Sequence, residues 1–248
     1  MPLDWLVNTL ITGACLNSCM MYTIMSDIQH PQQLPFGTDS FADNPEPRCP
    51  CLLLLDTSES MQGPPIAALN SALISLKNDL AADSLAVKRV ELAVISFGPV
   101  TVQHTFHTAS NFQPPSLFAH GDTPLGSAIK QGLDLVRRRK DEYRVNGIPF
   151  YRPWVFLITD GAPTDEWQSA AALVREGEAS KSFAFFAVGV ANANMAVLKE
   201  LSVREPLTLQ GLKFQELFLW LSNSMKSVSH SSPGTSVRIE KPQGWAEI

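Results

Sequence analysis

The strongest constraint on the fold of this chain is a run of four leucines, residues 52–55, which is closed by Asp56 and followed by hydroxyl residues. A continuous apolar run of this kind is typical of a strand buried on both faces, as in parallel sheets covered by helices. Ligands of open α/β sheets bind at the carboxyl ends of the strands. Asp56, Ser58 and Ser60 would therefore lie at a binding edge, and their oxygens are the donors that hard divalent cations take.

The rest of the chain alternates between apolar runs typical of strands and apolar residues spaced as on helices. Further strands are predicted at residues 90–97, 100–106, 154–158, 182–190 and 207–209, and helices at about 64–80, 125–144, 166–178, 194–201 and 214–228. Only Gly98 and Pro99 separate the second and third strands, too short a link for a parallel crossover, so this pair must be antiparallel. The alternation predicts a doubly wound α/β domain: a mostly parallel six-stranded sheet with helices on both faces and one antiparallel edge strand.

Three segments are expected in the 248 residues, a length that fits one α/β domain with extensions. Residues 1–48 would be an N-terminal extension and linker, residues 49–229 the domain, and residues 230–248 a loose tail rich in Ser, Pro and Gly. The first 25 residues contain no window of about 18 apolar residues, which a membrane span requires. They also lack the early positive charge of a signal peptide, so we interpret them as an appended segment or a short surface helix.

Charge and cysteine content exclude several classes of protein. The net charge is −5 and both signs are mixed along the chain, so neither nucleic acid nor an anionic membrane is an expected partner. The four cysteines, at positions 15, 19, 49 and 51, all lie in the first quarter, which argues against a disulfide framework and favours a reducing, cytoplasmic location. A four-thiolate zinc site is the alternative, but the C-x3-C and C-x-C spacings fit it poorly, so buried thiols are preferred.

Two of the predicted strands end in an aspartate, Asp56 on the first and Asp160 on the fourth. In a sheet of strand order 3-2-1-4-5-6 these strands are neighbours, and the crevice for a ligand opens between them. A third polar loop would bring the hydroxyl of Thr123 to the same place. The predicted metal ligands are therefore Asp56, Ser58, Ser60, Thr123 and Asp160.

These five residues resemble the metal-ion-dependent adhesion site of von Willebrand factor A domains. That family's pattern is D-x-S-x-S, then a distant Thr, and then an Asp after a later strand. Here residues 56–60 form the first part, and Thr123 and Asp160 complete it in order. The resemblance implies a Rossmann-like fold with a divalent cation bound at the five side chains.

Residues 49–248 also look like the TerY branch of these proteins, through the segments 54–61, 151–161, 186–190 and 214–222. This resemblance implies a scaffold or regulator in a bacterial tellurium-resistance or stress-response system. A metal-dependent protein phosphatase and a protein kinase of the same gene cluster would be its partners. The chain departs from the family at position 59, where Glu59 replaces the usual glycine. That acid would tighten cation binding or block an incoming carboxylate, or else point into solvent without a role.

The chemistry of the donors suggests how such a site would work. Ser58, Ser60 and Thr123 would be neutral direct ligands, while Asp56 and Asp160 would act mainly through bound waters. A cation held this way keeps one coordination position for a Glu or Asp of a partner protein. A small octahedral ion, Mg²⁺, fits this shell better than Ca²⁺ or Mn²⁺. We therefore expect a non-enzymatic module that binds partner proteins through magnesium.

Other readings of the same residues remain open. A metal-assisted hydrolase or phosphotransferase could use Asp56 or Asp160 as its base, but a third acid or a nucleophile is missing; a structural subunit with an idle site is the third possibility. His104 and His107 are three apart on a predicted strand, hence on opposite faces, and are interpreted as surface histidines. The basic run 137–140 is either a docking patch for an acidic partner or, preferably, a solvated helix face.

Overall fold

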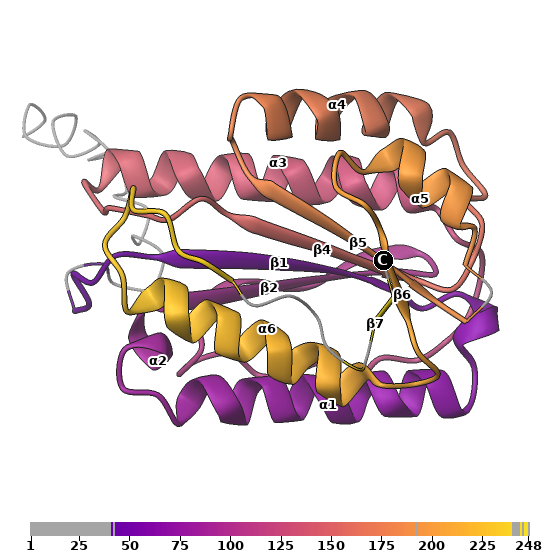
Figure 1. Cartoon of the computed structure of the whole chain (residues 1–248), viewed down its shortest axis with the longest axis horizontal. Helices are drawn as coiled ribbons and strands as arrows, with labels where there is room; N and C mark the ends of the chain where they lie inside the picture. The colour runs from indigo at the N-terminus through magenta and orange to yellow at the C-terminus, as the bar shows by residue number, and fades with distance from the viewer. Residues whose placement is uncertain (1–40, 42, 192, 240–243, 245, 248) are drawn as a thin grey trace, which may run out of the picture. The chain divides into compact units, whose positions relative to one another are not determined.

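A seven-stranded sheet lies at the centre of the chain, in the order β3-β2-β1-β4-β5-β6-β7 (Figure 1). The structure is a computed structural model that describes residues 41, 43–191, 193–239, 244 and 246–247, all of them in the unit that begins at Asp39. The strands are β1 (Cys49–Asp56), β2 (Val90–Phe97), β3 (Val100–Thr108), β4 (Trp154–Thr159), β5 (Ala184–Val190), β6 (Leu207–Leu209) and β7 (Ala246–Glu247). The helices are α1 (Pro64–Ala81), α2 (Ala86–Arg89), α3 (Leu125–Val145), α4 (Gln168–Ala179), α5 (Met195–Leu201) and α6 (Phe214–Ser229), with a 3-10 turn η1 (Glu59–Met61).

The predicted doubly wound sheet is confirmed for β1 to β6. These strands run parallel except β3, which pairs with β2 in the antiparallel sense across the two-residue turn that the sequence indicated. The tail adds an unpredicted strand, because β7 pairs antiparallel with β6 through Thr208 and Glu247. The expectations for residues 1–40, which include the cysteines at 15 and 19, lie outside the described residues. Among the helices of the described stretches, none has the length and apolar character needed to cross a membrane.

The leucine run of β1 is buried on both faces, as predicted. Leu52 and Leu54 pack with the helices α3, α4 and α5, whereas Leu53 and Leu55 pack with α1 and α6. Figure 1 shows these two helix layers on either side of the sheet. A side-chain carbon at Gly132 of α3 would lie 2.8 Å from the end of Leu52 and 2.9 Å from that of Leu54, so α3 approaches β1 closely at this glycine. The central strand therefore has no face left for solvent, and only its ends can carry function.

The two histidines of β3 lie on the same face, so the prediction of opposite faces is wrong. Irregular pairing between β2 and β3 places His107 opposite Leu92 and His104 opposite Val94, so that two intervening residues on β3 face one on β2. Such a bulge breaks the two-residue alternation of side chains. The imidazole centroids are 4.4 Å apart, and the Nδ1 of each ring donates to the carbonyl of Thr105 at 2.9 Å.

The thiols of Cys49 and Cys51 are buried, and neither forms a disulfide bond. Burial raises the pKa of Cys49 to about 12, with a smaller contribution from the charge of Glu91. Burial likewise raises the pKa of Cys51 well above its usual range. Both groups therefore stay protonated, which confirms the preferred interpretation of buried thiols for these two positions.

A buried carboxylate, Glu91, anchors the end of the sheet opposite Asp56. Its side chain is 1% exposed at the start of β2 and accepts hydrogen bonds from Arg48 at 3.0 Å, from Arg139 at 2.7 and 2.8 Å, and from the Tyr143 hydroxyl. Arg139 belongs to the basic run 137–140, so that run is not uniformly a solvated face. Its exposed members do fit the preferred interpretation, a solvated helix face, since Arg137 and Arg138 both pair with Asp134 of the same helix.

Removal of the Glu91 carboxylate should destabilise the fold strongly. The substitution Glu91→Ala removes the buried carboxylate that neutralises both Arg48 and Arg139, and we expect a loss of about 3–5 kcal/mol in the free energy of unfolding. Glu142→Ala is the matched control, because Glu142 binds the same Arg139 but is 53% exposed. It should cost about 0–1 kcal/mol. Denaturant unfolding measures both values, and equal losses would contradict this assignment.

Candidate metal centre

The register of the sheet brings the two predicted aspartates together. β1 and β4 pair in step up to Leu55 and Ile158, so the next residues, Asp56 and Thr159, lie side by side. The Thr159 hydroxyl donates a hydrogen bond to Oδ2 of Asp56 across the two strands. Asp160 follows directly, half-buried at the same edge of the sheet. Strand pairing therefore places Asp56 beside Thr159, and Asp160 is the first residue after β4.

A chain of hydrogen bonds joins four of the five predicted ligands. The backbone N–H of Ser58 donates to Oδ1 of Asp56 at 2.8 Å, as in a turn that is closed by an aspartate. The hydroxyls of Ser58 and Ser60 are 3.0 Å apart, and the Ser60 hydroxyl donates to Oδ1 of Asp160 at 2.7 Å. Asp56 and Ser58 are buried, whereas Ser60 is exposed. The group thus runs from the core to the surface.

The fifth predicted ligand, Thr123, lies beside the same carboxylates. A side-chain carbon placed on Gly161 would be 3.1 Å from Oγ1 of Thr123 and 3.8 Å from Oδ2 of Asp56, so both oxygens border one point. Thr123 is only 6% exposed. Its backbone is fixed to the loop after β4, because Thr123 N–H donates to the Thr164 hydroxyl at 3.1 Å and Thr164 N–H donates to the Thr123 carbonyl at 2.9 Å.

Asp165 holds this loop pair together, a role that the sequence did not reveal. The Asp165 carboxylate accepts from Gly126 N–H at 2.9 Å and from Ser127 N–H and Oγ at 2.7 Å. It therefore caps the first turn of α3, and Thr123 lies just before that turn. Gly126 is required there, since a side chain would collide with the carbonyl of Glu166. The contact joins residues 38 and 39 positions apart, which no local pattern shows.

The electrostatics of the site leave negative charge uncompensated. Burial raises the pKa of Asp56, an effect that its hydrogen bonds to Ser58 and Thr159 oppose and that the charge of Asp160 reinforces. In the part of the chain that the structure describes, no basic side chain pairs with Asp56 or Asp160. A buried carboxylate without a cationic partner is costly. A divalent cation at this edge would relieve that cost.

The donor set fits a hard cation and does not fit a zinc site. It consists of three hydroxyls and two carboxylates, all oxygen. Among the described residues there is no cluster of three or more His, Cys, Asp or Glu that could hold a metal. Zinc sites are usually built from such clusters, whereas magnesium is commonly held by one or two carboxylates with other oxygens completing the shell.

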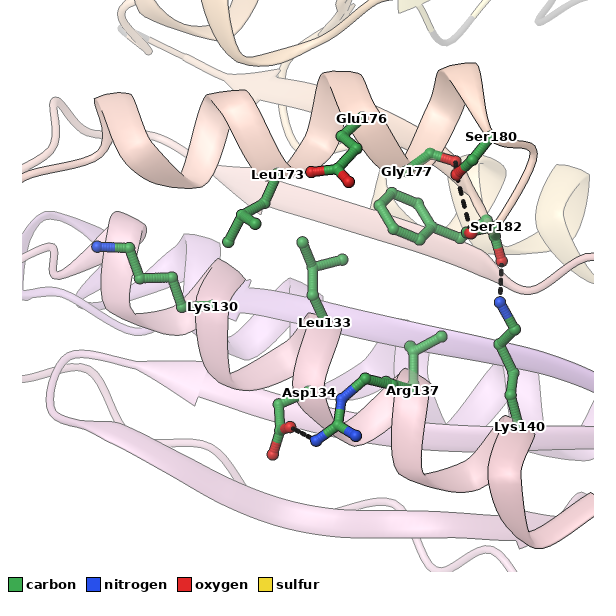
Figure 2. Close-up of a pocket in the computed structure, with 12 residues that line it drawn as sticks. Lys130, Leu133, Asp134, Arg137, Lys140, Leu173, Glu176, Gly177, Ser180 and Ser182 are labelled. Carbon is green, nitrogen blue, oxygen red and sulfur yellow. Dashed lines mark hydrogen bonds and ion pairs between the residues drawn. The ribbon is translucent and has the colours of Figure 1, made fainter.

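A groove between α3 and α4 is separate from these residues (Figure 2). It has a volume of about 370 Å³, and none of the five predicted ligands lines it. Its charged side chains are largely engaged with neighbours. Asp134 pairs with Arg137, and Nζ of Lys140 donates to the carbonyl of Ser182 at 3.1 Å. The converging oxygens are found at the edge of the sheet and not in this groove.

The arrangement of strands and side chains agrees with a comparison against known families. The model of the von Willebrand factor type A domain matches residues 52–209, which is more than half of the chain. The chain belongs to this family. A comparison of this chain with curated proteins found no match.

Solved structures with the same VWA fold share little sequence with this chain. The pilus adhesin SpaC from Lactobacillus rhamnosus GG is 11% identical with a TM-score of 0.60, over 73% of this chain and 30% of the adhesin. The vWF domain of the pilus tip protein Mfa5 from Porphyromonas gingivalis is 11% identical with a TM-score of 0.54, over 77% of this chain and 99% of that domain. Proximal thread matrix protein 1 from the mussel byssus is 14% identical with a TM-score of 0.51, over 73% of this chain. The likeness spans only 48% of the thread protein, less than two thirds of its length, as it does for SpaC.

The cap that Asp165 provides in this VWA domain can be tested by substitution. Asp165→Ala removes the acceptor for the first turn of α3 and should lower the free energy of unfolding by about 1–2 kcal/mol. Asp122→Ala is the control, since Asp122 is exposed in the same loop region and should change stability by no more than about 0.5 kcal/mol. Chemical denaturation with chelator present measures both, and an unchanged Asp165→Ala variant would contradict the capping role.

Proposed function

We propose that this VWA domain binds one divalent cation, Mg²⁺, and uses it to capture an acidic residue of a partner protein. The observation that supports this most directly is the environment of Asp56. It is a fully buried carboxylate, linked through hydroxyls to a second carboxylate, with no described basic side chain to neutralise it. The family supports the same conclusion, because the five residues fill its metal-site pattern in order.

Each residue has a role in this proposal that follows from its surroundings. Ser58, Ser60 and Thr123 would offer neutral oxygens, and Asp56 and Asp160 would hold the charge and orient the donors through hydrogen bonds. A bound cation would supply one coordination position for an external carboxylate. Because the hydroxyls are already bonded to the carboxylates or border them, little reorganisation is needed when the cation enters.

The biological setting is a proposal carried by the sequence resemblance alone. We infer a scaffold or regulator of the TerY branch in a bacterial tellurium-resistance or stress-response system, located in the cytoplasm. Its partners would be a metal-dependent protein phosphatase and a protein kinase of the same cluster. We propose that it is not an enzyme, because only two of the five predicted ligands are carboxylates. Among the solved relatives, SpaC is an adhesin and Mfa5 a tip protein, roles consistent with binding rather than catalysis.

Magnesium should stabilise the wild-type protein and not a protein without Asp56. A ligand that binds only the folded state adds about 2.7 kcal/mol at 100 times its dissociation constant. We therefore expect Mg²⁺ to raise the Tm of the wild type by several degrees, and Asp56→Ala or Asp160→Ala to remove most of that rise. Differential scanning calorimetry with and without chelator measures it.

Two results would count against the proposal. The first is a Tm that does not respond to Mg²⁺, Ca²⁺ or Mn²⁺ in the wild type, which would remove the cation from the function. The second is release of phosphate from a phosphoester substrate that Asp160→Ala abolishes, which would favour a metal-assisted hydrolase or phosphotransferase instead. A Tm response with no turnover supports partner capture.

The raised pKa of Asp56 predicts how stability without metal depends on pH. A carboxyl whose pKa is raised in the folded state stabilises the fold while it is protonated, and this contribution is lost as the pH rises through the folded-state pKa. In chelator at neutral pH, Asp56→Asn should therefore be at least as stable as the wild type. Its advantage should shrink as the pH is lowered through the raised pKa of Asp56, because the wild-type carboxyl then becomes protonated. Unfolding free energies across this range test the sign, and a less stable Asp56→Asn variant at neutral pH would contradict it.

A further inference from the structure

A large aromatic side chain projects into solvent from the loop between β3 and α3. Phe118 is 75% exposed. Among the described residues, it is the only aromatic in the set of large apolar side chains that are exposed; the others are Ile74, Val145, Leu173, Val203, Leu212 and Leu219. Single exposed apolar residues are common and need no function. The position and rigidity of Phe118 distinguish it from the rest.

The backbone on both sides of Phe118 is fixed. Leu117 is buried, and Asn70 of α1 holds its main chain twice, since Nδ2 donates to the Leu117 carbonyl and Oδ1 accepts from its N–H, both at 2.9 Å. On the other side, the N–H of His120 donates to the carbonyl of Thr57 at 2.8 Å, and its Nδ1 donates to the Phe118 carbonyl at 3.0 Å. A side chain presented on a fixed backbone loses little conformational freedom when it is covered, so it is suited to act as an anchor.

The same hydrogen bonds attach Phe118 to the candidate metal loop. Thr57 lies between Asp56 and Ser58, and its carbonyl receives the bond from His120. Two residues after Thr57, the N–H of Glu59 donates to the carbonyl of Gly121 at 3.0 Å. The loop that carries Phe118 therefore runs alongside the loop that carries three of the predicted ligands. A peptide whose carboxylate reaches the cation would have its neighbouring side chains close to Phe118.

The charge of the same two loops restricts what such a peptide can be. Glu59 and Asp122 are exposed and lie on the two loops that the bond from Glu59 to Gly121 joins. Like charges placed next to each other weaken association and suppress wrong partners. A partner segment with several acids in a row is disfavoured here, because only the carboxylate at the cation would be neutralised.

We propose that Phe118 and these rim carboxylates define the partner's sequence: a single acidic residue, with a large apolar residue close to it and no second acid. This inference depends on the proposed function, because the acidic residue is placed by the cation. The apolar contact with Phe118 supplies affinity that the cation alone would not, and the rim charge supplies selectivity.

A peptide library tests the proposal without knowledge of the natural partner. Random 12-residue peptides displayed on phage are selected against the immobilised full-length protein in Mg²⁺, with elution by chelator. The selection is repeated on Phe118→Ala, on Phe118→Leu, on Glu59→Gln with Asp122→Asn, and on Asp56→Ala. Val145→Ala is the matched control, because Val145 is 85% exposed at the other end of α3. The Tm of each variant confirms that it is folded.

The expected result is enrichment of one acid with a nearby Phe, Trp, Leu or Met on the wild type and on Val145→Ala. Phe118→Ala should keep the acid but lose the apolar preference, and should bind the selected peptide about tenfold more weakly, whereas Phe118→Leu retains most of the affinity. The double rim variant should accept second acids. An acid motif without an apolar neighbour, or one unchanged in Phe118→Ala, would overturn this inference and leave the proposed function intact. Absence of any magnesium-dependent acid motif would instead overturn the proposed function, and this inference with it.

Discussion

The structure depends on one buried carboxyl group at the end of its most apolar strand. Asp56 follows four fully buried leucines and is itself fully buried, so its charge cannot be solvated by water. Its partners are the N–H of Ser58 and the hydroxyl of Thr159, both neutral donors. Neutral hydrogen bonds compensate a buried charge only in part. The geometry of the surrounding loops can be understood as a response to this charge, because each loop brings an oxygen towards it.

A comparison with Glu91 shows that this chain does neutralise a buried carboxylate elsewhere in the sheet. Glu91 is as buried as Asp56, yet two arginines and a tyrosine bind it. The two groups lie at opposite ends of the parallel strands, Glu91 near the start of β2 and Asp56 at the end of β1. The fold thus contains one carboxylate that stabilises it and one that remains without a described cationic partner. The second arrangement is typical of a site that takes up a cation from solution.

The sequence predicted the parts of the molecule that follow from periodicity and from sheet topology. The leucine run located β1, and the rule that ligands bind where neighbouring strands diverge placed Asp56 beside Asp160. It could not predict Asp165 as a cap for α3, because that contact joins two loops with no shared pattern. The bulges of β3 also escaped it, since an extra residue in a strand leaves no periodic signal and reverses the face of His104. The strand β7 was missed because two residues in a polar tail do not form a recognisable run.

The division between strand and loop contributions explains why the site needs both. Strand pairing fixes the carboxylates, and it tolerates little change because a shift in register would move the whole strand. Hydroxyl oxygens are weaker ligands than carboxylates, so they contribute only when they are held in place before the cation arrives. In this domain the loop of Thr123 is held in place by hydrogen bonds with the backbone and side chain of Thr164 and with the side chain of Asp165. The same reasoning extends outward to Phe118, because the neighbouring His120 N–H is bonded to Thr57 in the candidate metal loop. The proposed contact surface is therefore held by the same hydrogen bonds as the loop of the predicted ligands, so that selectivity for a partner would be set by the chain before any partner binds.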